Sequence, residues 1–144
     1  MFRYALLALT LLICFASLSC QSYTSGLQQT VTRADETAAT GTLQTIATAQ
    51  QTYALSNGDN YGSFPQLVAG GYLDARFNAD KPVIKDYVLS MEVGRDAEGP
   101  FFRCKADPAD TSVKPGRHLY IDQSRMLRAN ATQPASASDP IAQP

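Results

Sequence analysis

Apolar side chains recur at helical spacing in the first half of the chain. One set of positions, three or four residues apart, falls on a single helix face: Ala39, Leu43, Ile46, Gln50 and Tyr53. The remaining positions of Thr42–Tyr53 are mostly Thr and Gln, which are polar and uncharged. We therefore predict an amphipathic helix that forms the spine of a small domain.

A weaker amphipathic pattern precedes this helix. Leu27, Val31, Ala34 and Ala38 also share one face, but they present little apolar surface. Because glycine costs roughly 1 kcal/mol against alanine inside a helix, we expect a bend or break at Gly41. The Asn-Gly pair within 56–60 is typical of the turn that ends a helix.

The second half of the chain has the pattern of an antiparallel sheet. Tyr61–Leu73 is a connector with a short helix, which Gly70-Gly71 ends. Strands are then expected at Val83–Val93, Phe101–Ala106, His118–Ile121 and Arg125–Arg128. The turn-forming composition of 94–100 makes the first two a hairpin. Helices followed by strands predict an α+β fold, with the N-terminal helix packed on a small antiparallel sheet.

The two ends of the chain differ from this middle part. Met1–Ser19 has a basic start, an apolar run and small residues at its end, which is typical of an export signal. The tail is rich in Ala, Ser, Pro, Asn and Gln, which favours disorder. We therefore predict a signal peptide at 1–19, a polar tether at 20–26, the domain at 27–128 and a disordered tail at 129–144.

Cys20 is the candidate lipidation site. Leu18-Ser19-Cys20 resembles a bacterial lipobox, although Ser17 stands where that motif usually has leucine. Lipidation would anchor the chain to a membrane by acyl chains, and Gln21 then implies the outer membrane, facing the periplasm. An ordinary signal peptidase could cut the same bond.

The cysteines offer two alternatives. Cys14 leaves with the signal, so a lipidated Cys20 leaves Cys104 as a single buried thiol. If Cys20 carries no lipid, the exported chain could pair it with Cys104 in a disulfide.

Charge narrows the range of partners. The 12 basic and 13 acidic side chains are interspersed, with a formal net charge of −1. No basic run of the kind that binds nucleic acid is present, so we expect no nucleic-acid partner.

Little in the sequence points to catalysis. His118 is the only histidine, and Cys104 or Ser124 with Asp122 could be its partners. None of them stands in the local context of a known nucleophile motif. We therefore expect no catalytic residues, no cofactor and no enzymatic activity.

Oxygen ligands for calcium occur in two loops, at Asp59 and Asn60 and at Asp107 and Asp110. Because the spacing is not that of an EF-hand and Asx-rich turns form for backbone reasons alone, we predict no metal site and keep calcium as an alternative.

The order of elements resembles the globular part of type IV pilins and type II secretion pseudopilins. The resemblance covers about 27–128 and lies in Leu43–Ile46, Ala49–Tyr53, Tyr61, Phe64–Leu67, Gly70–Asp74, Lys85–Leu89, Gly116–Asp122 and Met126–Arg128. It implies a helix-on-sheet fold and contact with pilus or secretion proteins. Pilins also have a glycine cleavage site and a glutamate near the start of a long apolar helix, and residues 1–19 contain neither feature.

Three functions follow as hypotheses. The first is a non-catalytic envelope lipoprotein whose pilin-like domain is a structural or interaction module. The second is a minor pilin or pseudopilin that keeps its apolar N-terminus as a membrane stem. The third is a small periplasmic ligand-binding or hydrolytic domain.

Overall fold

One long helix and one sheet make up the fold. A computed structural model describes residues 2–112 and 116–142, with side chains from residue 29 onward. The helices are α1 (Phe2–Ser56), α2 (Phe64–Ala69) and a short 3-10 helix, η1 (Ala75–Phe77). The strands are β1 (Val83–Ile84), β2 (Tyr87–Asp96), β3 (Gly99–Pro108), β4 (His118–Asp122) and β5 (Arg128–Asn130).

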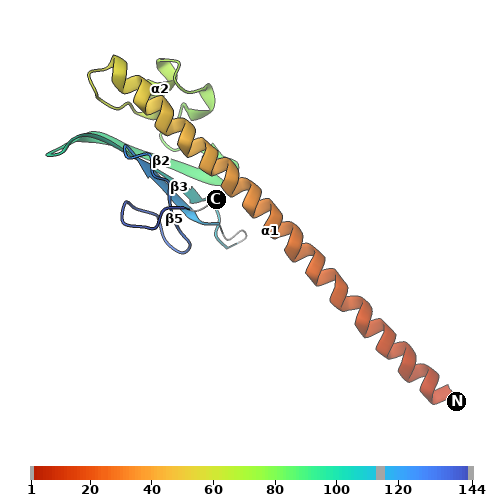
Figure 1. Cartoon of the computed structure of the whole chain (residues 1–144). Helices are drawn as coiled ribbons and strands as arrows, with labels where there is room; N and C mark the ends of the chain where they lie inside the picture. The colour runs from red at the N-terminus through yellow and green to blue at the C-terminus, as the bar shows by residue number, and fades with distance from the viewer. Residues whose placement is uncertain (1, 113–115, 143–144) are drawn as a thin grey trace.

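The five strands form an antiparallel meander in chain order, and the second half of α1 lies across one face of it (Figure 1). The N-terminal part of α1 extends far beyond the sheet (Figure 1). The α+β prediction is therefore confirmed.

The predicted helix face forms the core. Ala39, Leu43, Ile46 and Gln50 are completely buried, and Tyr53 at the end of the face is half-buried. They pack against the inward-facing side chains of the sheet, which include Leu89, Phe102, Cys104, Leu119 and Ile121. Since burying a Leu, Ile or Phe side chain contributes about 1.5–3 kcal/mol, this contact is the main apolar stabilisation of the fold.

The expected break at Gly41 is absent, because α1 continues through this residue. Gly41 lies on the exposed side of the helix, with nothing within 4 Å of the position of a Cβ atom. Ala39 and Leu43 on either side are fully buried, and their packing offsets the conformational cost of glycine.

The predictions for the N-terminus concern residues 1–26, whose side chains lie outside the part of the chain that the structure describes. The backbone of 20–26, expected as a tether, is helical within α1. The signal peptide at 1–19 and lipidation of Cys20 remain predictions. Among the residues with described side chains, no helix is long and apolar enough to cross a membrane.

Two strand boundaries differ from the prediction. The strand expected at Val83–Val93 is divided into β1 and β2 by a tight turn in which Lys85 has a φ of 55°. The strand expected at Arg125–Arg128 begins only at Arg128, because Arg125 has a φ of 62° and still belongs to the preceding turn.

The prediction of a disordered tail is wrong for 129–142. Ala129 pairs with Leu119 in β5, and Ile141 bridges back to Arg128. Asp139 accepts hydrogen bonds from Asn130 Nδ2 (2.6 Å) and from the backbone N–H (2.7 Å) and hydroxyl (2.8 Å) of Ser136. Ala135 is fully buried. Short polar side chains favour disorder by composition, but here they bond the backbone of a compact loop.

Candidate functional site

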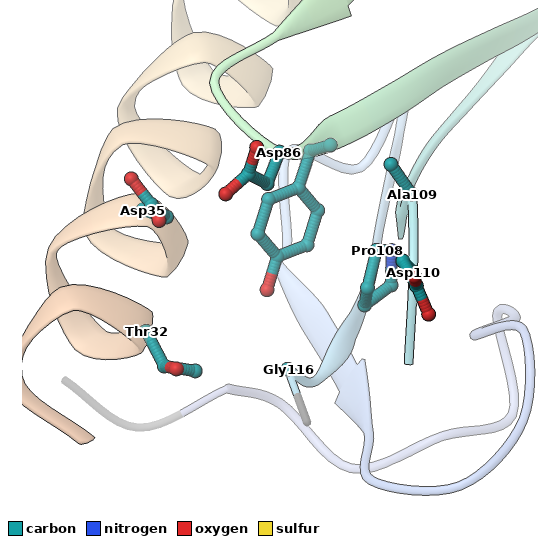
Figure 2. Close-up of a pocket in the computed structure, with 8 residues that line it drawn as sticks. Thr32, Asp35, Asp86, Pro108, Ala109, Asp110 and Gly116 are labelled. Carbon is teal, nitrogen blue, oxygen red and sulfur yellow. The ribbon is translucent and has the colours of Figure 1, made fainter. Parts of the chain in front are cut away.

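A recess of about 220 Å³ lies between α1 and the sheet. Figure 2 shows Thr32 and Asp35 on α1 facing the segments that contain Asp86 and Pro108–Asp110, with Gly116 below them. Tyr87 also lines the recess. The site thus joins the helix, the start of β2 and the connection from β3 to β4.

Tyr87 holds the connection between β3 and β4. Its hydroxyl donates to the carbonyl of Arg117 at 3.1 Å. Burial, reinforced by the negative charge of Glu36, raises the pKa of Tyr87 to about 12, so the phenol stays protonated and acts as a donor. A Cβ atom on Gly116 would lie 2.7 Å from this hydroxyl, and glycine is needed there for that reason.

An ion pair between Glu36 on α1 and Arg117, the residue before β4, also holds the connection between β3 and β4. Arg117 donates to Glu36 Oε1 from Nε at 2.7 Å and from Nη2 at 2.5 Å. The Glu36 side chain is 17% exposed, and its carboxylate raises the pKa of Arg117. The pair therefore links α1 directly to the residue that precedes β4.

Several polar groups that line the recess take part in contacts within the fold. No His, Cys or Lys is among its described lining residues, and Tyr87 is already committed to a backbone carbonyl. Asp110 accepts hydrogen bonds from the backbone N–H of Ser112 (2.9 Å) and from its hydroxyl (2.5 Å). Asp35 and Asp86 also have interaction partners. The arrangement fixes a helix on a sheet.

The predicted partners of His118 are not brought together with it. Nδ1 of His118 lies 2.6 Å from Oδ1 of Asp107, on the face of the sheet opposite α1. Asp122 instead binds the backbone N–H of Ser124 (2.9 Å) and its hydroxyl (2.5 Å). Asp107 was missed as the partner because the pairing depends on the register of β3 against β4.

Cys104 lies on the inner face and is inaccessible. It is a free thiol with no exposed surface, so the alternative disulfide to Cys20 is not formed. Burial raises the pKa of the thiol, which disfavours the reactive thiolate. Cys104 and His118 lie on opposite faces of the sheet, so these two residues do not form a Cys-His centre.

The loops considered for calcium do not converge. Asp59 lies in the turn after α1, Asp107 contacts His118, and Asp110 binds Ser112. Within residues 29–112 and 116–142, no group of three or more His, Cys, Asp or Glu side chains is placed to hold a metal ion.

Three of the residues that organise the site carried no signal that pattern reasoning detected. In the sequence, nothing distinguishes Glu36 from a solvated helix residue, and Tyr87 and Arg117 lie at the start of one predicted strand and just before another. The pairing of charges 81 residues apart becomes visible only in three dimensions. Comparison with protein-family models, characterised proteins and solved structures finds no match.

Proposed function

We propose that the protein is a non-catalytic component of a bacterial cell envelope, in which a pilin-like domain serves as a structural or interaction module. Its N-terminus attaches it to a membrane, as a lipoprotein acylated on Cys20 and facing the periplasm. The observation that carries the proposal is that only the second half of α1 packs on the sheet, so the helix that follows Cys20 extends away from the domain and would separate it from an acylated N-terminus (Figure 1).

The exposed face of α1 supports a contact role. Gln44, Thr45, Thr48, Gln51 and Thr52 are exposed and uncharged. The threonine hydroxyls already donate to backbone carbonyls one turn earlier, at 2.9 Å for Thr45, 3.0 Å for Thr48 and 3.1 Å for Thr52. A partner could therefore cover this face without leaving these donors unpaired.

The test is the chemistry of the mature N-terminus. The full chain is expressed in a two-membrane bacterium, and its envelope fractions are analysed by mass spectrometry. We expect an N-terminal acylated Cys20 in the outer-membrane fraction, and we expect Cys20→Ser to lose both the acyl mass and this location. The control Cys14→Ser should leave processing unchanged. An intact, unmodified Met1 would contradict the lipoprotein proposal.

The continuity of α1 favours a second candidate, a minor pilin or pseudopilin with a retained stem. The helix has no break at Gly41 or within 20–26, so its backbone could run from a membrane into the domain. In that case, peptides from residues 1–19 should be recovered from assembled filaments or secretion complexes of the native host. Filaments that contain only chains starting at Cys20 would exclude this candidate.

A further inference from the structure

Met91 on β2 has a sulfur atom that contacts a buried polar side chain of α1. Nε2 of Gln50 donates a hydrogen bond to this Sδ at 3.1 Å. The same nitrogen carries a second N–H. It also donates to the carbonyl of Gly62 at 2.6 Å, and the Gly62 N–H donates to Oε1 of Gln50 at 2.9 Å. The Met91 sulfur therefore belongs to the group of contacts that holds the loop 57–63 against α1 and the sheet.

The Met91 side chain is half-buried rather than enclosed. It packs against the core but is only partly buried, whereas Leu89, two residues earlier on the same face, has no exposed surface. β1 pairs with β2 only at Tyr87 and Val88, so no strand of the described part of the chain covers β2 at Met91 on that side. A small oxidant in the solvent can therefore reach Met91 without unfolding of the sheet.

The other sulfur atoms with described positions lack this combination of access and contact. Cys104 has no exposed surface. Met126 is 44% exposed and lies in the turn region between β4 and β5, away from Gln50. Met91 thus combines access from the solvent with a hydrogen bond to a buried amide, and Met126 is a natural control for it.

We propose that Met91 is an oxidation-sensitive contact that sets how tightly the loop 57–63 is held to the domain. The oxidant is a hydroperoxide, of which hydrogen peroxide is the simplest. A lone pair of the thioether sulfur attacks one peroxide oxygen, the O–O bond breaks, an S–O bond forms and water leaves. The sulfur is oxidised by two electrons and the peroxide is reduced by two. The product is methionine sulfoxide, which sulfoxide reductases return to the thioether.

The sulfoxide does not fit the contact that the thioether makes. At a separation of 3.1 Å, Sδ of Met91 and Nε2 of Gln50 leave no room for an oxygen atom between them. An oxygen directed at Gln50 forces the sulfur to withdraw from the core by about the length of the new bond. An oxygen directed elsewhere places a strongly polar group against apolar side chains. In both geometries the packing around the Gln50 amide changes, and the bonds that hold Gly62 weaken.

The experiment treats two variants of the full chain, in a non-ionic detergent, with hydrogen peroxide. Met126→Leu retains Met91, and Met91→Leu retains Met126, while both substitutions keep the apolar volume. Mass spectrometry of peptides gives the oxidised fraction of each methionine, and thermal melting gives the stability. We expect oxidation to lower the melting temperature of Met126→Leu by about 5 °C. The same treatment should leave that of Met91→Leu unchanged.

Two local signals connect this loss of stability to the Gln50 contact. In oxidised Met126→Leu, hydrogen exchange at the Gly62 N–H should become about tenfold faster or more, while exchange at Ala129 in β5 stays unchanged. The NMR signals of the Gln50 side-chain amide should shift on oxidation. Both signals should return after treatment with the two methionine sulfoxide reductases, one for each sulfoxide epimer.

Three outcomes would overturn the proposal. They are a Met91 that stays reduced in the folded wild type while Met126 is oxidised, a Met91 sulfoxide that leaves exchange at Gly62 unchanged, and an equal loss of stability in the two variants. The readouts belong to the folded domain, so these outcomes are distinct from failure of lipidation at Cys20.

Discussion

The side chain of Gln50 and the backbone of Gly62 form a closed pair of hydrogen bonds. Nε2 donates to the Gly62 carbonyl at 2.6 Å, and the Gly62 N–H donates to Oε1 at 2.9 Å. Gln50 is completely buried on α1 and also contacts Sδ of Met91 at 3.1 Å. A Cβ on Gly62 would lie 3.0 Å from the Tyr53 ring, so a larger residue there would require the ring to shift by a few tenths of an ångström.

Replacing Gln50 should destabilise the fold. Gln50→Leu keeps the volume but leaves the buried N–H and C=O of Gly62 without partners, so the free energy of unfolding should fall by about 2 kcal/mol or more. Urea denaturation measures the change. Gln51→Leu, at an exposed neighbouring position, is the control, with a change within about 0.5 kcal/mol. Equal effects of the two substitutions would contradict a structural role of the Gln50 amide.

Two buried phenols should make the domain sensitive to alkali. Burial raises the pKa of Tyr87 and of Tyr120 from 10.0 to about 12, with nearby carboxylates, Glu36 and Asp122, adding to the effect. The unfolded chain releases these protons near pH 10, so the stabilisation is complete below that pH and is lost as the pH rises toward 12.

Thermal melting across this window checks the prediction. The double variant Tyr87→Phe, Tyr120→Phe should lose much of the decrease in melting temperature between pH 10 and pH 12, because it has no such protons to release. A decrease as steep as that of the wild type would assign the alkaline sensitivity to other groups.

Cys104 should react only after unfolding. Its side chain has no exposed surface, and burial raises the pKa of the thiol, so both access and thiolate formation are disfavoured. Alkylation with iodoacetamide, read by mass spectrometry of the peptide that contains Cys104, should be negligible in the native protein and complete in urea. Gln123→Cys adds a thiol in an exposed turn and should be labelled at once. Rapid native labelling of Cys104 would mean that the sheet opens beneath α1.

The C-terminal loop should contribute to stability. Ending the chain after Asn130 removes the buried Ala135, the acceptor groups of Asp139 and the Pro140 carbonyl that binds the Ala129 N–H at 3.1 Å. We expect a lower melting temperature and faster hydrogen exchange at Ala129. Gln133→Ala, at an exposed position of the same loop, should have little effect. An unchanged melting temperature after truncation would mean that this loop does not stabilise the domain.

Asp139 adds a pH dependence to the same loop. Hydrogen bonds from Asn130 and Ser136 lower its pKa below 3.8. The stabilisation is therefore present above the unfolded value and is lost as the pH falls through the lower folded value. Asp139→Asn should lower the melting temperature at neutral pH and reduce the further loss in acid. If wild type and variant lose stability in parallel as the pH falls, this role of Asp139 is refuted.

The spacing of apolar residues along the chain was sufficient to predict burial where the period of a single helix or strand decides it. Ala39, Leu43 and Ile46 were predicted on the inner face of a helix, and they are fully buried there. Phe102, Cys104 and Ala106 alternate along the strand predicted at Phe101–Ala106, and all three are fully buried on one face of the sheet. These predictions succeed because the geometry of a helix or strand fixes which neighbours share a face.

Composition was a poorer guide where context dominates. Gly41 does not interrupt α1, because buried residues on either side hold the helix in place. The C-terminal loop is ordered although its composition is typical of disorder, because Asp139 gathers donors from residues three and nine positions away.

The sequence by itself thus determined the helix face, the hairpin and the α+β order of elements, because these depend on spacing along the chain. Only the tertiary structure decided that Glu36 pairs with Arg117, that His118 pairs with Asp107 and that β1 pairs with the start of β2. These contacts depend on the register of the strands and on the position of α1 across the sheet. The packing of the whole core sets both, and no local window of residues specifies them.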